Sequence, residues 1–93
     1  MKKGTLTNGF KFSVDENIMR DAEFLDLLVE VDEGNILSYP KMTNKLLGAD
    51  QKKKLYNKLR DKKSGIVDIK EVGKAIVEVL TIIGQEEDEG KNS

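Results

Sequence analysis

The fold is decided by residues 51–83, QKKKLYNKLRDKKSGIVDIKEVGKAIVEVLTII. The second half of this stretch predicts a helix over 69–83. Asp68 stands at the N-cap position, and Glu71 three residues later gives the spacing of a capping box. Gly84 follows the last apolar residue and predicts the C-terminal stop. The apolar residues in between recur on one helical face: Val72, Ala75, Ile76, Val79, Leu80 and Ile83.

The first half of the stretch predicts a partner helix over 51–62. Ser64-Gly65 interrupts the apolar pattern and predicts a tight break, followed by a short extended piece at Ile66-Val67. The residues available to pack against the last helix are Leu55, Tyr56 and Leu59. The sequence therefore predicts two packed helices at the centre of the fold.

The N-terminal residues 5–14 predict a β-hairpin. Asn8-Gly9 is a dipeptide that tolerates the positive φ angles of a type I′ turn, and it separates two short runs with strand-forming residues. Phe10, Phe12 and Val14 alternate with polar residues, so one face of the hairpin is apolar. Because an isolated hairpin is marginally stable, we expect that face to lie on the helices.

Residues 21–33 predict a helix with more apolar surface than one core contact needs. Asp21 is its N-cap and Gly34-Asn35 its terminator. Leu25 and Val29 widen its apolar arc to about twice the usual core-facing stripe. Two interpretations stay open: the hairpin or the next helix covers both residues, or they form part of a protein-binding surface. The compact arc itself consists of Phe24, Leu27, Leu28 and Val31.

The remaining segments complete a mainly α-helical domain. Ile36-Leu37 is an apolar link, and Pro40–Leu47 predicts a short helix that Gly48 ends, with Asp50 capping the next. The prediction is one small domain over residues 1–84, with the hairpin at 5–14 and about four helices within 21–83. The acidic residues 85–93 are expected to form a disordered tail.

Composition excludes several classes of site. The chain has 93 residues, of which 38% are apolar and 35% charged, and it lacks cysteine and histidine. Disulfides, thiolate or imidazole metal sites and histidine-based acid–base catalysis are therefore impossible. The sequence has no apolar run of membrane-spanning length, and we expect a cytoplasmic protein that is not an enzyme and uses no cofactor.

The net charge of −1 hides an asymmetry between an acidic segment, 15–33, and a basic segment, 41–63. One interpretation is that the two halves face one another or are simply solvated. The other is that the two surfaces mediate head-to-tail self-association or attract partners. An alternative function is a small helical regulatory or nucleic-acid-binding module that uses the basic residues 52–63. Only Tyr56 is available there for base stacking, which disfavours nucleic acid.

Residues 60–71 have the framework of a calcium-binding EF-hand loop, with Gly65 at the sixth position and Glu71 at the twelfth. The ligand positions do not fit, because Arg60, Lys62 and Ser64 occupy the first, third and fifth positions. Two cations at those positions would repel calcium, and we expect no metal site.

The order of several motifs is similar to that of the small tail assembly chaperones of long-tailed bacteriophages and prophages. The resemblance covers nearly all of residues 5–83, and it rests on order and spacing, with no catalytic signature. The matching stretches are Leu6–Phe12, Val29–Asn35, Tyr39–Lys41, Leu46–Gly48, Lys53–Asp61 and Gly65–Val67, followed by the last helix.

The resemblance implies a helical, non-enzymatic protein that binds the tape measure protein and assists polymerisation of the major tail protein. Such chaperones act in the host cytoplasm and are absent from the mature virion. They are often also made in a longer form by ribosomal frameshifting. The family brings no catalytic residues, and we expect Leu25 and Val29 to contact the partner. Self-association is a further expected property.

Overall fold

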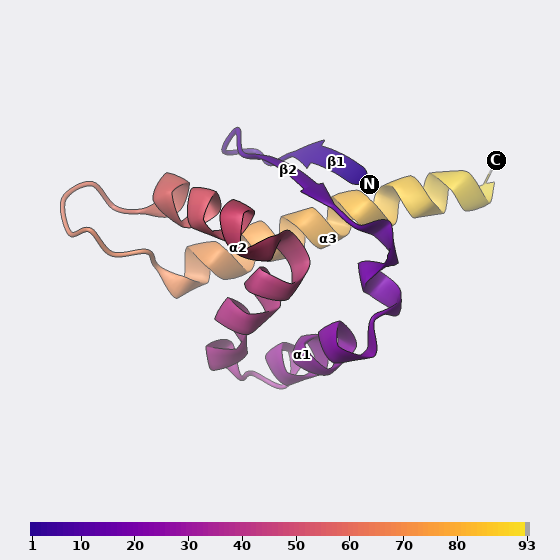
Figure 1. The fold of residues 1–93 in the computed structure, drawn as a ribbon, viewed down its shortest axis with the longest axis horizontal. Helices are drawn as coiled ribbons and strands as arrows, with labels where there is room; N and C mark the ends of the chain where they lie inside the picture. Colours follow the sequence, from indigo (N-terminus) through magenta and orange to yellow (C-terminus); the bar gives the residue numbers. More distant parts are fainter. Residues whose placement is uncertain (93) are drawn as a thin grey trace.

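The computed structural model describes the backbone of residues 1–92 and the side chains of residues 1–84. It confirms the predicted fold class, a mainly helical domain with an N-terminal antiparallel hairpin (Figure 1). In chain order the elements are β1 (Lys2–Thr5), β2 (Lys11–Val14), the 3₁₀ helix η1 (Glu16–Arg20), α1 (Ala22–Asp32), the 3₁₀ helix η2 (Ile36–Ser38), α2 (Tyr39–Leu59) and α3 (Ile69–Asn92).

Helix α3 is the central helix of the domain, and both α2 and the hairpin contact it. It runs along the long axis of the molecule, with the hairpin and the second half of α2 beside it and α1 beside the first half of α2 (Figure 1). Its predicted apolar face is confirmed, because Ile76 and Val79 are fully buried and Leu80 is partly buried. The hairpin, η1 and the three helices all contribute to one apolar core.

The hairpin and its second strand are confirmed, but the predicted first strand and turn type are wrong. Thr5 pairs with Lys11 and Lys2 pairs with Val14, so the first strand starts before the predicted residues 5–7 and the connection spans residues 6–10. Gly9 has a φ of 90°, whereas Asn8 has a negative φ, which excludes a type I′ turn. Instead the Gly9 N–H donates to the Leu6 carbonyl, and the Leu6 N–H to the Phe10 carbonyl. This is the longer hairpin loop that places glycine at a bulge.

Both ends of α1 follow the local signals in the sequence. Oδ1 of Asp21 accepts hydrogen bonds from the N–H groups of Glu23 and Phe24, as an N-cap does. At the other end, Gly34 has a φ of 96°. The Gly34 N–H donates to the Val31 carbonyl, and the Asn35 N–H to the Glu30 carbonyl, which is the Schellman arrangement.

Helix α2 is bent into two parts at Gly48, as the sequence predicts. Gly48 has φ 81° and ψ 164°, a conformation that only glycine adopts readily. The predicted cap at Asp50 is wrong. The side chain that makes hydrogen bonds at the bend is that of Gln51. Its Nε2 donates to the carbonyls of Leu47 and Ser13, and its Oε1 accepts from the Ser13 N–H. One amide thus ties the bend to the edge of β2.

The loop between α2 and α3 differs in detail from the prediction. Helix α2 ends at Leu59 rather than residue 62, and Ile66-Val67 lies in the connecting loop outside any strand or helix. The turn is closed by backbone hydrogen bonds between residues 61 and 66, and Gly65 has a φ of 76°. Asp68 caps α3 through the Lys70 N–H, as predicted. The Glu71 carboxylate does not complete a capping box; it lies 3.9 Å from Nζ of Lys74.

Gly84 does not end α3, because the helix continues to Asn92. Gly84 lies among helical residues, and a Cβ built there meets no atom within 4 Å. The predicted disordered tail over 85–93 falls on residues outside the described side chains and stays a prediction.

We expect Gly84→Ala to raise the free energy of unfolding by about 0.5–1 kcal/mol, because alanine loses less backbone entropy than glycine in a helix. Urea unfolding of the purified chain measures this change. The control is Gly34→Ala, which also has open space around it but a φ of 96° and should lower the free energy of unfolding. A similar loss from both substitutions would mean that the helix stops at Gly84.

Candidate protein-binding surface

Leu25 and Val29 are both exposed on α1, with 38% and 56% of their surface accessible. They lie one turn apart on the same side of the helix. Neither the hairpin nor the next helix covers them, so the interpretation that they are ordinary core residues is wrong. Phe24 is fully buried, as predicted. The sequence also predicts that Leu28 faces the core, but Leu28 is only partly buried.

Three further apolar residues extend this surface. Ile36 and Leu37 in η2 are 52% and 81% exposed, and Val77 in α3 is 56% exposed. Sequence reasoning treated Ile36-Leu37 as a link and omitted Val77 from the helical face. The signal available for Val77 was that a valine stands off the periodic stripe that was assigned to the core.

Val29, Ile36 and Val77 line two adjoining hollows, which together we call the α1–α3 groove. The first, of about 560 Å³, lies between η2 and the start of α3, where Ile36, Ile69 and Val77 line it. The second, of about 600 Å³, is lined by Val29 and Val31 of α1. Tyr39 and Val77 line both hollows, so the two lie next to each other. Of the two predicted site residues, Val29 lines the groove and Leu25 does not.

Tyr39 lines both hollows and packs against α3 at Gly73. A Cβ added to Gly73 would lie 2.9 Å from Cζ of Tyr39. The absence of a side chain at position 73 therefore lets the tyrosine ring lie directly on the helix backbone. Thr43, fully buried one turn later, donates to the Tyr39 carbonyl at 2.7 Å and fixes the start of α2. The groove therefore has a firmly held floor.

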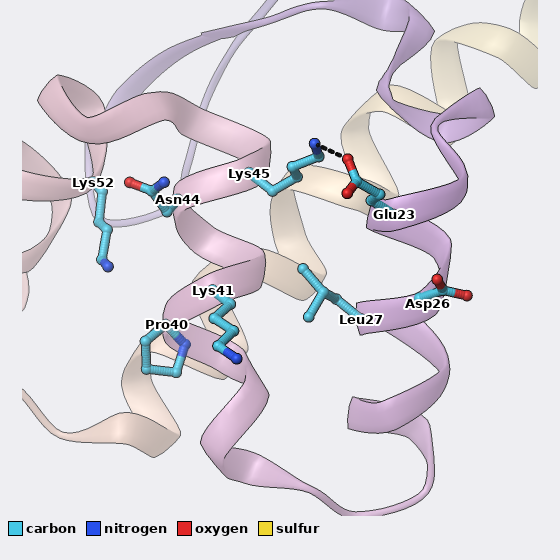
Figure 2. Close-up of a pocket in the computed structure, with 8 residues that line it drawn as sticks. All are labelled: Glu23, Asp26, Leu27, Pro40, Lys41, Asn44, Lys45 and Lys52. Atoms are coloured by element: carbon cyan, nitrogen blue, oxygen red, sulfur yellow. Dashed lines mark hydrogen bonds and ion pairs between the residues drawn. The ribbon is translucent and has the colours of Figure 1, made fainter.

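A second, charged cleft of about 540 Å³ lies between α1 and the first part of α2 (Figure 2). Lys45 reaches across from α2, with its Nζ 3.0 Å from Glu23 and 3.4 Å from Asp21. Figure 2 shows Lys41 and Leu27 facing each other farther along the same cleft. The acidic and basic segments of the sequence therefore face one another here, which supports the first interpretation of the charge asymmetry.

Hydrogen bonding shifts the pKa values within this cleft. The hydrogen bond with Glu23 raises the pKa of Lys45; desolvation opposes the rise, and Asp21 adds to it. For Asp21, desolvation raises the pKa, but the N–H groups of Phe24 and Glu23 together with Lys45 outweigh it. The pKa of Asp21 is therefore lower than its ordinary value. The lysine is held charged between two carboxylates, which suits a structural link between α1 and α2.

The basic segment presents Lys52 over the ring of Tyr56, with Nζ 5.5 Å from the ring centre. Burial raises the pKa of Tyr56. The guanidinium of Arg60 is also engaged, since Nη1 donates to the Gly65 carbonyl at 2.8 Å. The aromatic face and one of the cations of this segment are thus already used within the domain.

Among residues 1–84 there is no cluster of three or more acidic side chains placed to hold a metal ion. Arg60 occupies the first position of the calcium-loop framework, and its guanidinium donates to the Gly65 carbonyl of the same loop. A positively charged side chain therefore lies where a calcium ligand would be needed. In the part of the chain that the structure describes, no helix has the length and apolarity needed to cross a membrane.

The chain matches no protein-family model, no curated protein and no solved structure. The surfaces themselves and the order of the sequence motifs are therefore the basis for a functional proposal.

Proposed function

We propose that this protein is a bacteriophage or prophage tail assembly chaperone. In this role it binds segments of the tape measure protein, keeps them soluble and assists polymerisation of the major tail protein in the host cytoplasm. The observation that carries the proposal is the exposed apolar surface of α1, at Leu25 and Val29, on a chain of which 35% of the residues are charged.

The chemistry of the surface supports a chaperone that holds a helical client. A long client helix with an apolar stripe aggregates unless that stripe is covered, and covering it requires apolar surface on a soluble carrier. Leu25 and Val29 provide such surface, and Glu23, Asp26 and Glu30 make the remaining face of α1 acidic and exposed. The order of motifs over residues 5–83 supports the identity of the client.

The arrangement of the basic segment speaks against the alternative of a nucleic-acid-binding module. Base stacking needs an open aromatic face, and Lys52 already lies over Tyr56. The two functions also differ in their response to salt. Binding to phosphates weakens steeply as salt rises, whereas apolar client binding should persist between 50 mM and 500 mM salt.

We expect the double substitution Leu25→Ser and Val29→Ser to weaken tape measure binding by about tenfold or more, as loss of a desolvated apolar contact does. The free energy of unfolding should change by about 0.5 kcal/mol or less per residue, because both side chains are exposed. Co-purification with tape measure segments of the same phage and a thermal melt measure the two effects.

The matched control is Ile66→Ser, which removes an apolar side chain that is 64% exposed in the α2–α3 loop. This variant should bind like the unmodified protein. If no tape measure segment is retained even by the unmodified protein, the proposed function is wrong. The neighbouring reading frames give an independent test: a tail-tube gene and a very long tape measure gene should flank the coding sequence.

A further inference from the structure

The α1–α3 groove has the shape and charge of a receptor for one helix. We infer that it binds a single amphipathic helix of a partner protein, with acidic residues beside the apolar stripe. The apolar side chains of that helix lie on Tyr39 and between Ile36 and Val77. Its acidic side chains meet Lys70 and Lys74, which stand at the groove margin on α3.

The size of the groove fits about two helical turns. The α3 residues that line its first part extend from Ile69 to Val77, and eight steps of about 1.5 Å give a length of about 12 Å. A helix in such a groove presents apolar anchors at i, i+3 or i+4, and i+7. Tyr39 lies against Gly73 without a partner bound, so the groove is already formed, and a preformed groove lowers the entropic cost of binding.

The charged residues at the margin of the groove favour a partner helix of opposite charge. Lys70 and Lys74 lie one turn apart on α3 and both line the groove. Nζ of Lys74 lies 3.9 Å from Glu71, an exposed pair that holds the ammonium group only weakly. Asp32 is the one charged residue that lines the second hollow, at the opposite end. Acidic residues of the partner therefore match the α3 end of the groove.

A second copy of this chain fits less well than another protein. The helix with suitable acidic character is α1, but its Val29 already lines the groove. The α1 helix of a second copy has two exposed apolar anchors, Leu25 and Val29, where the groove takes three, and Val29 also lines that copy's own groove. The inference rests on the proposed function only for the identity of the helix as part of the tape measure protein.

The first test uses two lactam-stapled peptides of roughly 16 residues, a length at which an unstapled helix is only marginally stable in water. Both have a leucine stripe at i, i+3, i+4 and i+7, flanked by glutamates in one peptide and by lysines in the other. Fluorescence anisotropy of the labelled peptides measures binding to the full chain at 50 mM salt. We expect the glutamate peptide to bind roughly tenfold tighter or more. Equal affinities would overturn the inference.

The second test places the peptide in the groove. The double substitution Ile36→Ser and Val77→Ser should weaken binding of the glutamate peptide by roughly tenfold or more. The matched control, Leu37→Ser with Ile66→Ser, removes two similarly exposed apolar side chains outside the groove and should leave the affinity unchanged. Equal losses in both double variants would overturn the inference.

The third test concerns the lysines. Lys70→Glu with Lys74→Glu should reverse the preference, so that the lysine peptide binds tighter. Lys53→Glu with Lys54→Glu makes the same change in charge on α2, away from the groove, and should keep the original preference. If the Lys70→Glu, Lys74→Glu variant still binds the glutamate peptide more tightly than the lysine peptide, the inference is overturned.

Sedimentation of the chain alone tests whether a second copy of the chain, rather than another protein, occupies the groove. A dimer that the Ile36→Ser, Val77→Ser variant dissociates would mean that a second copy fills the groove, and would overturn the inference. A different result would refute the proposed function alone. In that case the glutamate peptide binds in the groove, but no tape measure segment binds the protein. The reverse result, tape measure binding that ignores the groove variant, would refute the groove alone.

Discussion

Replacing Phe24 by alanine is expected to lower the free energy of unfolding by about 3–5 kcal/mol. Phe24 is fully buried where α1 joins the common core, so truncation removes a large apolar contact and leaves a cavity. A domain of this size has a free energy of unfolding of only about 5–10 kcal/mol. The variant should therefore melt far below the unmodified protein, by about 4–8 °C for each kcal/mol lost.

Leu25→Ala is the matched control for Phe24→Ala, since it truncates the next residue of the same helix. Leu25 is 38% exposed, and its truncation should cost about 1 kcal/mol or less. Urea unfolding followed by circular dichroism measures both variants. Equal costs at the two positions would mean that α1 is rotated relative to the core, and that Leu25 belongs inside the domain.

Replacing Gly48 by alanine is expected to lower the free energy of unfolding by about 1–3 kcal/mol. The cost arises from the backbone alone, because φ 81° and ψ 164° are strained for any L-residue with a Cβ. A Cβ added at position 48 meets no atom within 4 Å, so steric clash does not contribute. Relief of the strain would straighten α2 and separate Gln51 from Ser13 in β2.

A chemically synthesised chain with D-alanine at position 48 is the control for this effect. A D-residue adopts positive φ without strain, and the added methyl group has open space. The D-alanine chain should be at least as stable as the unmodified protein, while the L-alanine chain is less stable. If both alanine chains lose the same stability, the strained backbone is not the cause.

The sequence by itself determined the features that depend on near neighbours along the chain. Asp21 and Asp68 cap their helices because a carboxylate needs only the N–H groups two or three residues ahead. Gly34 and Gly48 mark an end and a bend because positive φ is a property of one residue. The buried face of α3 follows from a period of 3.6 residues, which does not depend on what covers it.

Only the tertiary structure decided which apolar residues remain exposed. Leu28 stands in the predicted compact arc of α1 but is only partly buried, and Leu25 and Val29 could not be assigned from the sequence, because their burial depends on segments far apart in the chain. The groove is formed by bringing residue 29, residue 39 and residues 69–77 together, and no local pattern encodes that meeting. The bond between Gln51 and β2 likewise spans 38 residues, so its partner is chosen by packing and not by spacing.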